Sequence, residues 1–454
     1  MGFVSLYTAF SGLQAAQAGM DTASHNVSNA GTVGFTRQRV DQASRLPGYR
    51  SFGPVGTGVD ITDITRSRDV MLDARARTAL GGESRFATLG NLLSGVEAAM
   101  AEPDNGITAG LDSLWTSFED LALNPPDTAA RHGVLNNLQS LTARIRSVAE
   151  GWQASAATAA ADITTEVAET NRLLQEVAEL NRSILQTGGS DFTPNDLLDK
   201  RDLAIDQLSQ LAGIRASITD SGAARVSLDG LALVHDAVAS QISFDPGTNQ
   251  LVHSSGVAID AGGSIGARQG FLANVLPQYQ AELNTFAEDL AAALNGQHAA
   301  GFTQSGAAGG PMLAYSPGSA ALTIDVAVSD PSDLAVAAGG PPVAEFDGLN
   351  AEALAGLRSA LAAIAGTQSL GSAIRGIVGS VGSATAGAFT EAGAQSAIAT
   401  SAENARAQIH GVSVDEEMVN LLTSQRAYEA AARVMTAVDQ TLDTLINRTG
   451  VVGR

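Results

Sequence analysis

Histidines are the first residues of this sequence to test for chemistry, because histidine is a common general base and metal ligand. No two of the six stand three or four positions apart, the spacing with which a helix presents two zinc ligands on one face. Cysteine is absent, which removes thiolate ligands, cysteine nucleophiles and disulfides together. The sequence therefore predicts no metal site. The histidine positions are His25, His132, His235, His253, His298 and His410.

Two glycine clusters could in principle bind phosphate. The stretches 53–58 and 262–266 lack the lysine of a phosphate loop and the strand, turn and helix of a dinucleotide site, so we interpret them as turns. We identify no nucleophile elbow for a serine, because the Gly-x-Ser-x-Gly match at 262–266 is one of these two turns.

Three aspartates, Asp196, Asp199 and Asp202, recur at helical spacing beside Lys200 and Arg201. We interpret them as a solvated helix face, because nothing else in the sequence supports a pair of catalytic carboxylates. The sequence thus predicts no enzyme and no cofactor.

The charge balance limits the partners. The net charge is −21 over 454 residues and Lys200 is the single lysine, so the chain lacks the basic stripe that nucleic acid or an anionic membrane surface requires. The first basic residue is Arg37, so no secretory signal peptide with a basic n-region is present.

Both ends of the chain carry an apolar seam, a stripe whose members alternate at intervals of three and four. The first seam includes Leu6, Phe10, Leu13 and Met20, and continues to Val27. The last seam comprises Met418, Leu421, Tyr428, Met435, Leu442 and Leu445. Ser413 and Glu416 form a capping box that predicts the start of the last helix.

A single stripe of this kind is usual for an ordinary core helix. Two features favour a coiled coil here: the stripes stand at the two ends of the chain, and the other faces carry small residues, such as Gly12 and Ala431, instead of charges. We predict that the two helices pair, and that they are disordered in the monomer because their seams need partners.

The middle of the chain divides into helical and strand patterns. Helical periodicity covers residues 69–100, 106–123, 134–152 and 163–185, and Pro194 opens another helix. After Gly213 the period changes to two, which predicts a meander of hairpins, and a helix on Leu272 to Leu294 interrupts the strand-like segments.

The predicted fold is mainly α with an inserted β region. A terminal coiled-coil domain comprises residues 1–38 with 412–454, a central helical bundle 39–212 with 268–300 and 346–411, and a smaller β-rich outer domain 213–267 with 301–345.

The first helix is followed by NVSNAGTVGFTRQ, residues 26–38. Its asparagines and glycines favour caps and turns, so the chain must change direction there. With Ser11 to Ala15, the residues Asn26, Asn29, Thr32, Gly34 and Phe35 resemble the N-terminal signature of the axial proteins of the bacterial flagellum. The continuation to Gln38, the stretch NDLLDKRD at 195–202 and the segment 411–447 are similar to the flagellar hook-associated protein 1 family.

The resemblance implies a structural protein that assembles at the distal end of the hook and joins hook to filament. Its implied partners are further copies in a ring or helical layer, the hook protein, the next hook-associated junction protein, and a flagellar export chaperone at the C-terminal helix. The implied location is extracellular, after type III export without a cleavable signal peptide.

Two alternatives remain open at this stage. The chain could be a hook or filament subunit proper of the same axial family, although the Thr36 to Gln38 continuation and the acidic block before Met418 favour the junction protein. An enzyme carried on an axial protein would need a compact insert with convergent polar groups, whereas the β region is rich in Ala, Gly and Ser.

Overall fold

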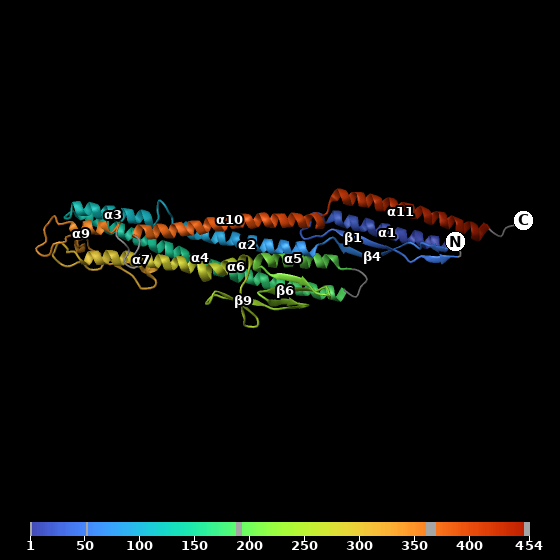
Figure 1. Ribbon diagram of the computed structural model, residues 1–454, viewed down its shortest axis with the longest axis horizontal. Coiled ribbons are helices and arrows are strands. Elements are labelled where there is room, and N and C mark those ends of the chain that lie inside the picture. Colours follow the sequence, from blue (N-terminus) through green and yellow to red (C-terminus); the bar gives the residue numbers. More distant parts are fainter. Residues whose placement is uncertain (1, 51–52, 188–192, 360–368, 449–454) are drawn as a thin grey trace.

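The chain forms a long rod in which the two ends of the sequence lie side by side (Figure 1). A computed structural model describes residues 2–50, 53–187, 193–359 and 369–448. α1 (Gly2–Ser28) and α11 (Val414–Asp443, extended by the π-helical turn Thr444–Arg448) form one end of the rod. No helix in these ranges is long and apolar enough to cross a membrane.

Five further long helices build the body of the rod. They share a continuous core around Trp115, Phe118, Trp152 and Phe286, each almost completely buried. The helices are α2 (Val70–Ala99), α3 (Ile107–Leu123), α4 (Thr128–Thr187), α7 (Leu276–Ala299) and α10 (Leu370–His410). The prediction of a mainly helical protein with a smaller β-containing region is confirmed.

The sequence predicted two helices between residues 134 and 185, but α4 is one continuous helix. The segment between them, 153–162, contains six alanines, the residue with the highest helix propensity. Ala159 within it is fully buried. High propensity and burial together carry the helix through a segment that lacks the apolar period.

A group of short antiparallel strands lies beside the second half of α4 (Figure 1). Four of them form a meander in sequence order and three form a second small sheet, as the change of period after Gly213 predicted. The first sheet contains β5 (Arg215–Ile218), β6 (Ala224–Leu228), β7 (Leu231–His235) and β8 (Val238–Ala239); the second contains β9 (Ile242–Asp245), β10 (Gln250–His253) and β11 (Ala258–Ile259).

Asn171 and Asn181 of α4 hold the two sheets. The Asn171 amide bonds both the N–H and the C=O of Ile242, at 2.9 and 2.8 Å. The Asn181 amide bonds both backbone groups of Ala224, at 2.9 and 2.8 Å, and donates to the Asp236 carbonyl at 2.6 Å. Each asparagine side chain thus satisfies the backbone N–H and C=O of one strand residue, as a neighbouring strand would do within a sheet.

The structure does not group residues 301–345 with the strands at 213–267. The strands at 213–267 follow α5 (Asn195–Ala212). After them the chain runs away from the sheets through α6 (Gly263–Gly270), a π-helical turn (Phe271–Val275) and α7. Residues 301–345 consequently pack on the first half of α4, where Arg131 donates to the Pro331 and Leu334 carbonyls. That segment contains β12 (Leu313–Ala314), α8 (Ala320–Thr323), β13 (Asp325–Val326) and a 3-10 turn (Pro331–Asp333), and α9 (Leu349–Gly356) follows it.

A second departure is a β-hairpin within residues 38–66, which the sequence had assigned to the helical bundle. β1 (Gln38–Ser44) pairs antiparallel with β4 (Val59–Arg66), with a bulge at Asp41/Gln42, and β2 (Gly48–Arg50) pairs with β3 (Gly53–Val55) near the tip. The hairpin lies along α1 (Figure 1). The β-branched residues of β4 favour a strand, but its apolar residues Val59, Ile61 and Ile64 do not keep a period of two, so the pattern did not predict it.

We expect Asn181→Ala to lower the free energy of unfolding by about 3 kcal/mol, because a buried N–H and two buried carbonyls lose their partner. Urea denaturation measures the change. Asn137→Ala is the matched control: its amide is exposed, makes one bond to the Ser113 carbonyl, and should change stability by less than about 0.5 kcal/mol. Equal effects of the two substitutions would contradict the role assigned to Asn181.

Candidate functional site at the joint between the terminal helices and the rod

α1 and α11 pack as an antiparallel pair, which we call the terminal pair. Asn26 contacts Glu417, a Cβ on Gly19 would lie 2.7 Å from Ser424 Oγ, and one on Gly12 would lie 3.9 Å from Ala431 Cβ. Each step of seven residues along α1 is matched by seven residues back along α11, which is the heptad period of a coiled coil.

The side of α1 that faces α11 carries small residues rather than the apolar seam. Ala9, Ala16 and Ala23 are buried, whereas Leu6, Leu13 and Met20 are half-buried and Phe10 is 44% exposed. Small side chains let two helix backbones approach closely, so the face of α1 with glycine and alanine packs against α11. The seam predicted on α1 is therefore only partly covered within one chain.

α11 is covered on one face only. Its seam residues Leu421, Tyr428, Met435 and Leu442 are half-buried, but Met418 is 45% exposed and Leu445 is exposed as well. Glu417 is the single buried residue of the helix. The predicted helix start is confirmed, since the Ser413 side chain accepts a hydrogen bond from the Glu416 N–H, while the Glu416 carboxylate pairs with Arg37 at 3.1 Å.

Asn26, Arg37 and Glu417 join the terminal pair to the hairpin. The Asn26 amide, fully buried, donates to the Gln38 carbonyl at 2.8 Å and to Glu417 at 3.0 Å, and accepts from the Gln38 N–H at 2.9 Å. The Nε and Nη2 atoms of Arg37 each lie 2.8 Å from Glu417 Oε1 and donate to it. Arg37 thus holds one oxygen of the Glu417 carboxylate and Asn26 the other, so the two residues together orient the start of α11.

The other motif residues turn the chain out of α1. Asn29 donates to the His25 carbonyl at 3.0 Å and accepts from Thr32 at 3.2 Å, which closes the helix end. Gly34 adopts a φ of +83°, a left-handed conformation that side chains disfavour, beside Leu203. Phe35 lies edge-on to the His25 ring at 5.3 Å.

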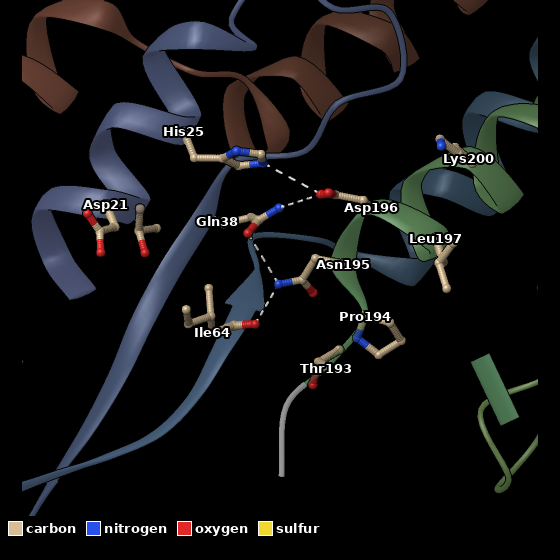
Figure 2. A pocket seen from close by; sticks show the side chains of 11 residues that line it. Asp21, His25, Gln38, Ile64, Thr193, Pro194, Asn195, Asp196, Leu197 and Lys200 are labelled. Carbon is tan, nitrogen blue, oxygen red and sulfur yellow. Dashed lines mark hydrogen bonds and ion pairs between the residues drawn. The ribbon is translucent and has the colours of Figure 1, made fainter. Parts of the chain in front are cut away.

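A surface cleft of about 750 Å³ opens beside this turn, between α1, the hairpin and the start of α5 (Figure 2). His25 Nε2 lies 3.6 Å from Asp196 Oδ1, Gln38 donates to the same oxygen at 3.4 Å, and Asn195 donates to the Ile64 carbonyl at 2.6 Å. These contacts tie the helix end to the rod. No set of three or more His, Asp or Glu side chains suited to a metal ion occurs in the part of the chain that the structure describes.

Beneath the cleft, arginines and aspartates alternate in a closed ring of ion pairs. Asp202 pairs with Arg68 and Arg77, Arg68 and Arg406 share Asp73, and Arg77 and Arg406 share Asp206, with pair distances up to 3.4 Å. We call this set the ion-pair ring.

Arg66 extends the ion-pair ring toward the hairpin by bridging Asp202 and Asp199, at 3.0 and 2.7 Å. Asp199 also accepts from the Thr36 N–H at 3.0 Å. The interpretation of Asp199 and Asp202 as a solvated face is therefore wrong: both are buried, and only Asp196 is exposed. The arginines that pair with them come from segments distant in the sequence, so the spacing of the aspartates did not reveal the ion pairs.

Charges in the joint shift two pKa values in ways that matter for stability. Burial alone would raise the pKa of Asp202, but Arg68, Arg66, Arg201 and Arg77 outweigh it and lower the pKa. Burial lowers the pKa of His410, against an opposing effect of Asp73. His410 stays neutral and its Nε2 accepts from the Asp69 N–H at 3.3 Å.

Three family models match separate parts of the chain. The model for the flagellar hook-associated protein FlgK helical domain matches residues 93–313. The flagella basal body rod protein model matches residues 6–36, and the flagellar basal body rod FlgEFG protein C-terminal model matches residues 408–448. The two models of basal body rod proteins thus cover most of the terminal pair and the turn that follows α1.

Whole-chain relatives agree with these matches. Flagellar hook-associated protein 1 of Bacillus subtilis is 30% identical over an alignment that covers all of this chain and 99% of the relative. The protein of the same name in Escherichia coli is 24% identical, with 97% of this chain and 98% of the relative covered. A solved structure of the flagellar hook junction protein FlgK from Burkholderia pseudomallei has a similar fold, with a TM-score of 0.66 at 18% identity, over 74% of this chain and 99% of that one.

We expect Asp202→Ala to destabilise the folded chain by about 3–5 kcal/mol, because it leaves three buried guanidinium groups without this carboxylate. Asp196→Ala, on the same helix but at an exposed carboxylate, should cost at most about 1 kcal/mol. Urea unfolding of both variants measures the difference. A mild effect of Asp202→Ala would show that the ion-pair ring does not hold the joint.

The folded pKa of His410 lies below its ordinary value of 6.5, so below that pH the unfolded chain takes up a proton that the folded chain does not. Stability should therefore fall as the pH drops from about 7 to about 5. In His410→Gln the fall should be smaller, whereas the control His132→Gln, at an exposed histidine, should keep it. Unfolding free energies at several pH values test this, and an identical slope in His410→Gln would refute it.

Proposed function

The chain belongs to the flagellar hook-associated protein 1 family, and on that premise we propose that it assembles at the distal end of the hook and joins the hook to the filament. It is a structural axial protein of the bacterial flagellum. The models that match both ends are named for basal body rod proteins, which are other axial proteins. The model that matches residues 93–313 is named for the FlgK helical domain, and this match favours a hook-associated protein over a hook or filament subunit. We propose no reaction for it.

One observation supports assembly through the terminal pair most directly: among the residues that the structure describes, most side chains of α11 are exposed or half-buried, and Glu417 is its one buried residue. Val419, Leu422 and Val434 are exposed in addition to Met418. A helix with apolar residues on several sides is stable when several neighbours cover it. Further copies packed around the axis would cover these faces, together with the half-covered seam of α1.

A ring or helical layer needs contacts between different surfaces of neighbouring copies. We propose that the terminal pair supplies such contacts at the axis and that the sheets beside α4 lie outside. The hook protein and the next hook-associated junction protein would then meet the two ends of this layer. The predicted disorder of both terminal segments before assembly stays a prediction, because the structure contains them as a formed pair.

Export is the remaining part of the proposal. A chain that leaves through the flagellar type III apparatus travels unfolded, and the exposed apolar residues of α11 would then need protection from aggregation. We propose that an export chaperone binds this helix, with Met418, Leu421, Leu422, Tyr428, Met435 and Leu442 as its contacts.

We expect Phe10→Asp to abolish filament attachment without lowering the melting temperature of the isolated chain. The substituted side chain is half exposed in one chain, but assembly would bury its charge without a partner, at a cost of several kcal/mol per copy. The variant is expressed in cells that lack the native gene, and hooks, filaments and filament protein in the medium are examined.

Gln14→Asp is the matched control, because it stands one heptad before the native Asp21 on the same helix. It should restore filaments, whereas cells without the chain should carry bare hooks and release filament protein. Full motility with Phe10→Asp would move the assembly surface away from α1. Intact filaments in cells without the chain would overturn the proposed function itself.

A further inference from the structure

A small pocket lies at the base of the β1–β4 hairpin, next to the cleft of Figure 2 and separate from most of it. Its volume is about 210 Å³, the scale of one side chain. Val33, Phe35 and Leu203 form an apolar wall, and Asp196 and Lys200 stand at the polar rim. We call it the base pocket.

The base pocket is built and not merely open. Gly34, with its positive φ, lets the backbone pass within about van der Waals distance of Leu203, since a Cβ there would lie 3.2 Å from Leu203 Cβ. Lys200 at the rim has no acidic partner in the described ranges of the chain. An occupant with an apolar body and a polar end would satisfy both sides of the pocket.

The tip of the same hairpin exposes apolar side chains of that type. Leu46 is 89% exposed and Tyr49 is 87% exposed, the most exposed of the five tyrosines. Tyr49 belongs to the paired strands β2 and β3, where it lies opposite Pro54. Below these strands, Thr57 donates to the Leu46 carbonyl at 2.7 Å. Arg45 pairs with Asp60 at 2.6 Å and stacks on the Tyr7 ring at 4.9 Å. A supported, exposed tyrosine is typical of a contact residue, because tyrosine combines a large apolar ring with a hydroxyl.

We propose that Tyr49 of one copy inserts into the base pocket of a neighbouring copy of this chain. The ring would lie against Phe35 and Leu203, and the phenol oxygen would lie at the rim, where Lys200 can donate to it and Asp196 can accept from it. This inference rests on the proposed assembly, and it adds a contact away from the terminal pair.

The length of the hairpin requires that a Tyr49 side chain in this pocket come from a second copy. The seven residues of β1 alone extend about 20 Å at 3.3 Å per residue, so the tip and the base of one hairpin cannot meet. The contact joins two different surfaces of the same chain, and such heterologous contacts repeat from copy to copy into a ring or a helix. It would therefore link neighbours along a layer.

The absence of cysteine allows a clean cross-linking test in assembled flagella. Leu46→Cys at the tip and Val33→Cys at the rim are combined in one chain that keeps Tyr49, and detached flagella are treated with a short bismaleimide. We expect a ladder of covalent dimers and higher oligomers of this chain. The matched control combines Val33→Cys with Val238→Cys, an exposed position on the sheet beside α4, and should give no ladder.

Adding Tyr49→Ala to the first pair should remove most of the ladder, while Tyr49→Phe, which keeps the ring, should retain it. Restored filaments without a ladder, a ladder that does not depend on residue 49, or cross-links only to another flagellar protein would each overturn the inference and leave the proposed function standing. Failure of the unsubstituted chain to restore filaments would instead overturn the proposed function.

Discussion

The buried carboxylate of Asp202 is the interaction on which the joint depends. It meets Arg66 from the end of the hairpin, Arg68 from the following turn and Arg77 from α2, so three segments converge on one side chain of α5. Charges taken out of water are stable only when every one of them is paired, and the ion-pair ring closes through Asp73, Asp206 and Arg406 to achieve this. α10, which leads to α11, is thereby fixed relative to the hairpin that follows α1.

The joint in turn decides what the terminal pair offers to other molecules. Because Asn26 and Arg37 both bind Glu417, α11 begins at a fixed place and runs back along the small-residue face of α1. The glycine and alanine residues of α1 pack against α11 within the chain, and several larger apolar side chains remain exposed on the outer faces. The two helices thus bury one face of each against the other and expose apolar side chains on their outer faces, which suits a subunit that packs against other subunits.

Local patterns predicted much of the fold. Heptad spacing placed both terminal helices, the capping box placed the start of α11, and the change of period after Gly213 placed the meander. The turn that the asparagines and glycines of residues 26–38 predicted follows α1 directly, at Asn29 and Gly34. Three features were not predicted: the hairpin at 38–66, whose strands are polar and keep no apolar period of two; the continuity of α4, whose middle lacks the apolar period; and the place of residues 301–345, which depends on the length and direction of α7.

The sequence by itself determined most of the elements and the family, because helix period, capping and turn chemistry act between residues a few positions apart, and the family motifs are contiguous. Only the tertiary structure decided which faces are used. Asp199 and Asp202 have the same spacing as a solvated stripe, and their burial depends on arginines that lie 125 to 136 positions away. The apolar seam of α1 and its small-residue face are equally periodic, and the close approach of α11 selected the small one. Burial and pairing are properties of surfaces brought together by folding, which spacing along the chain does not contain.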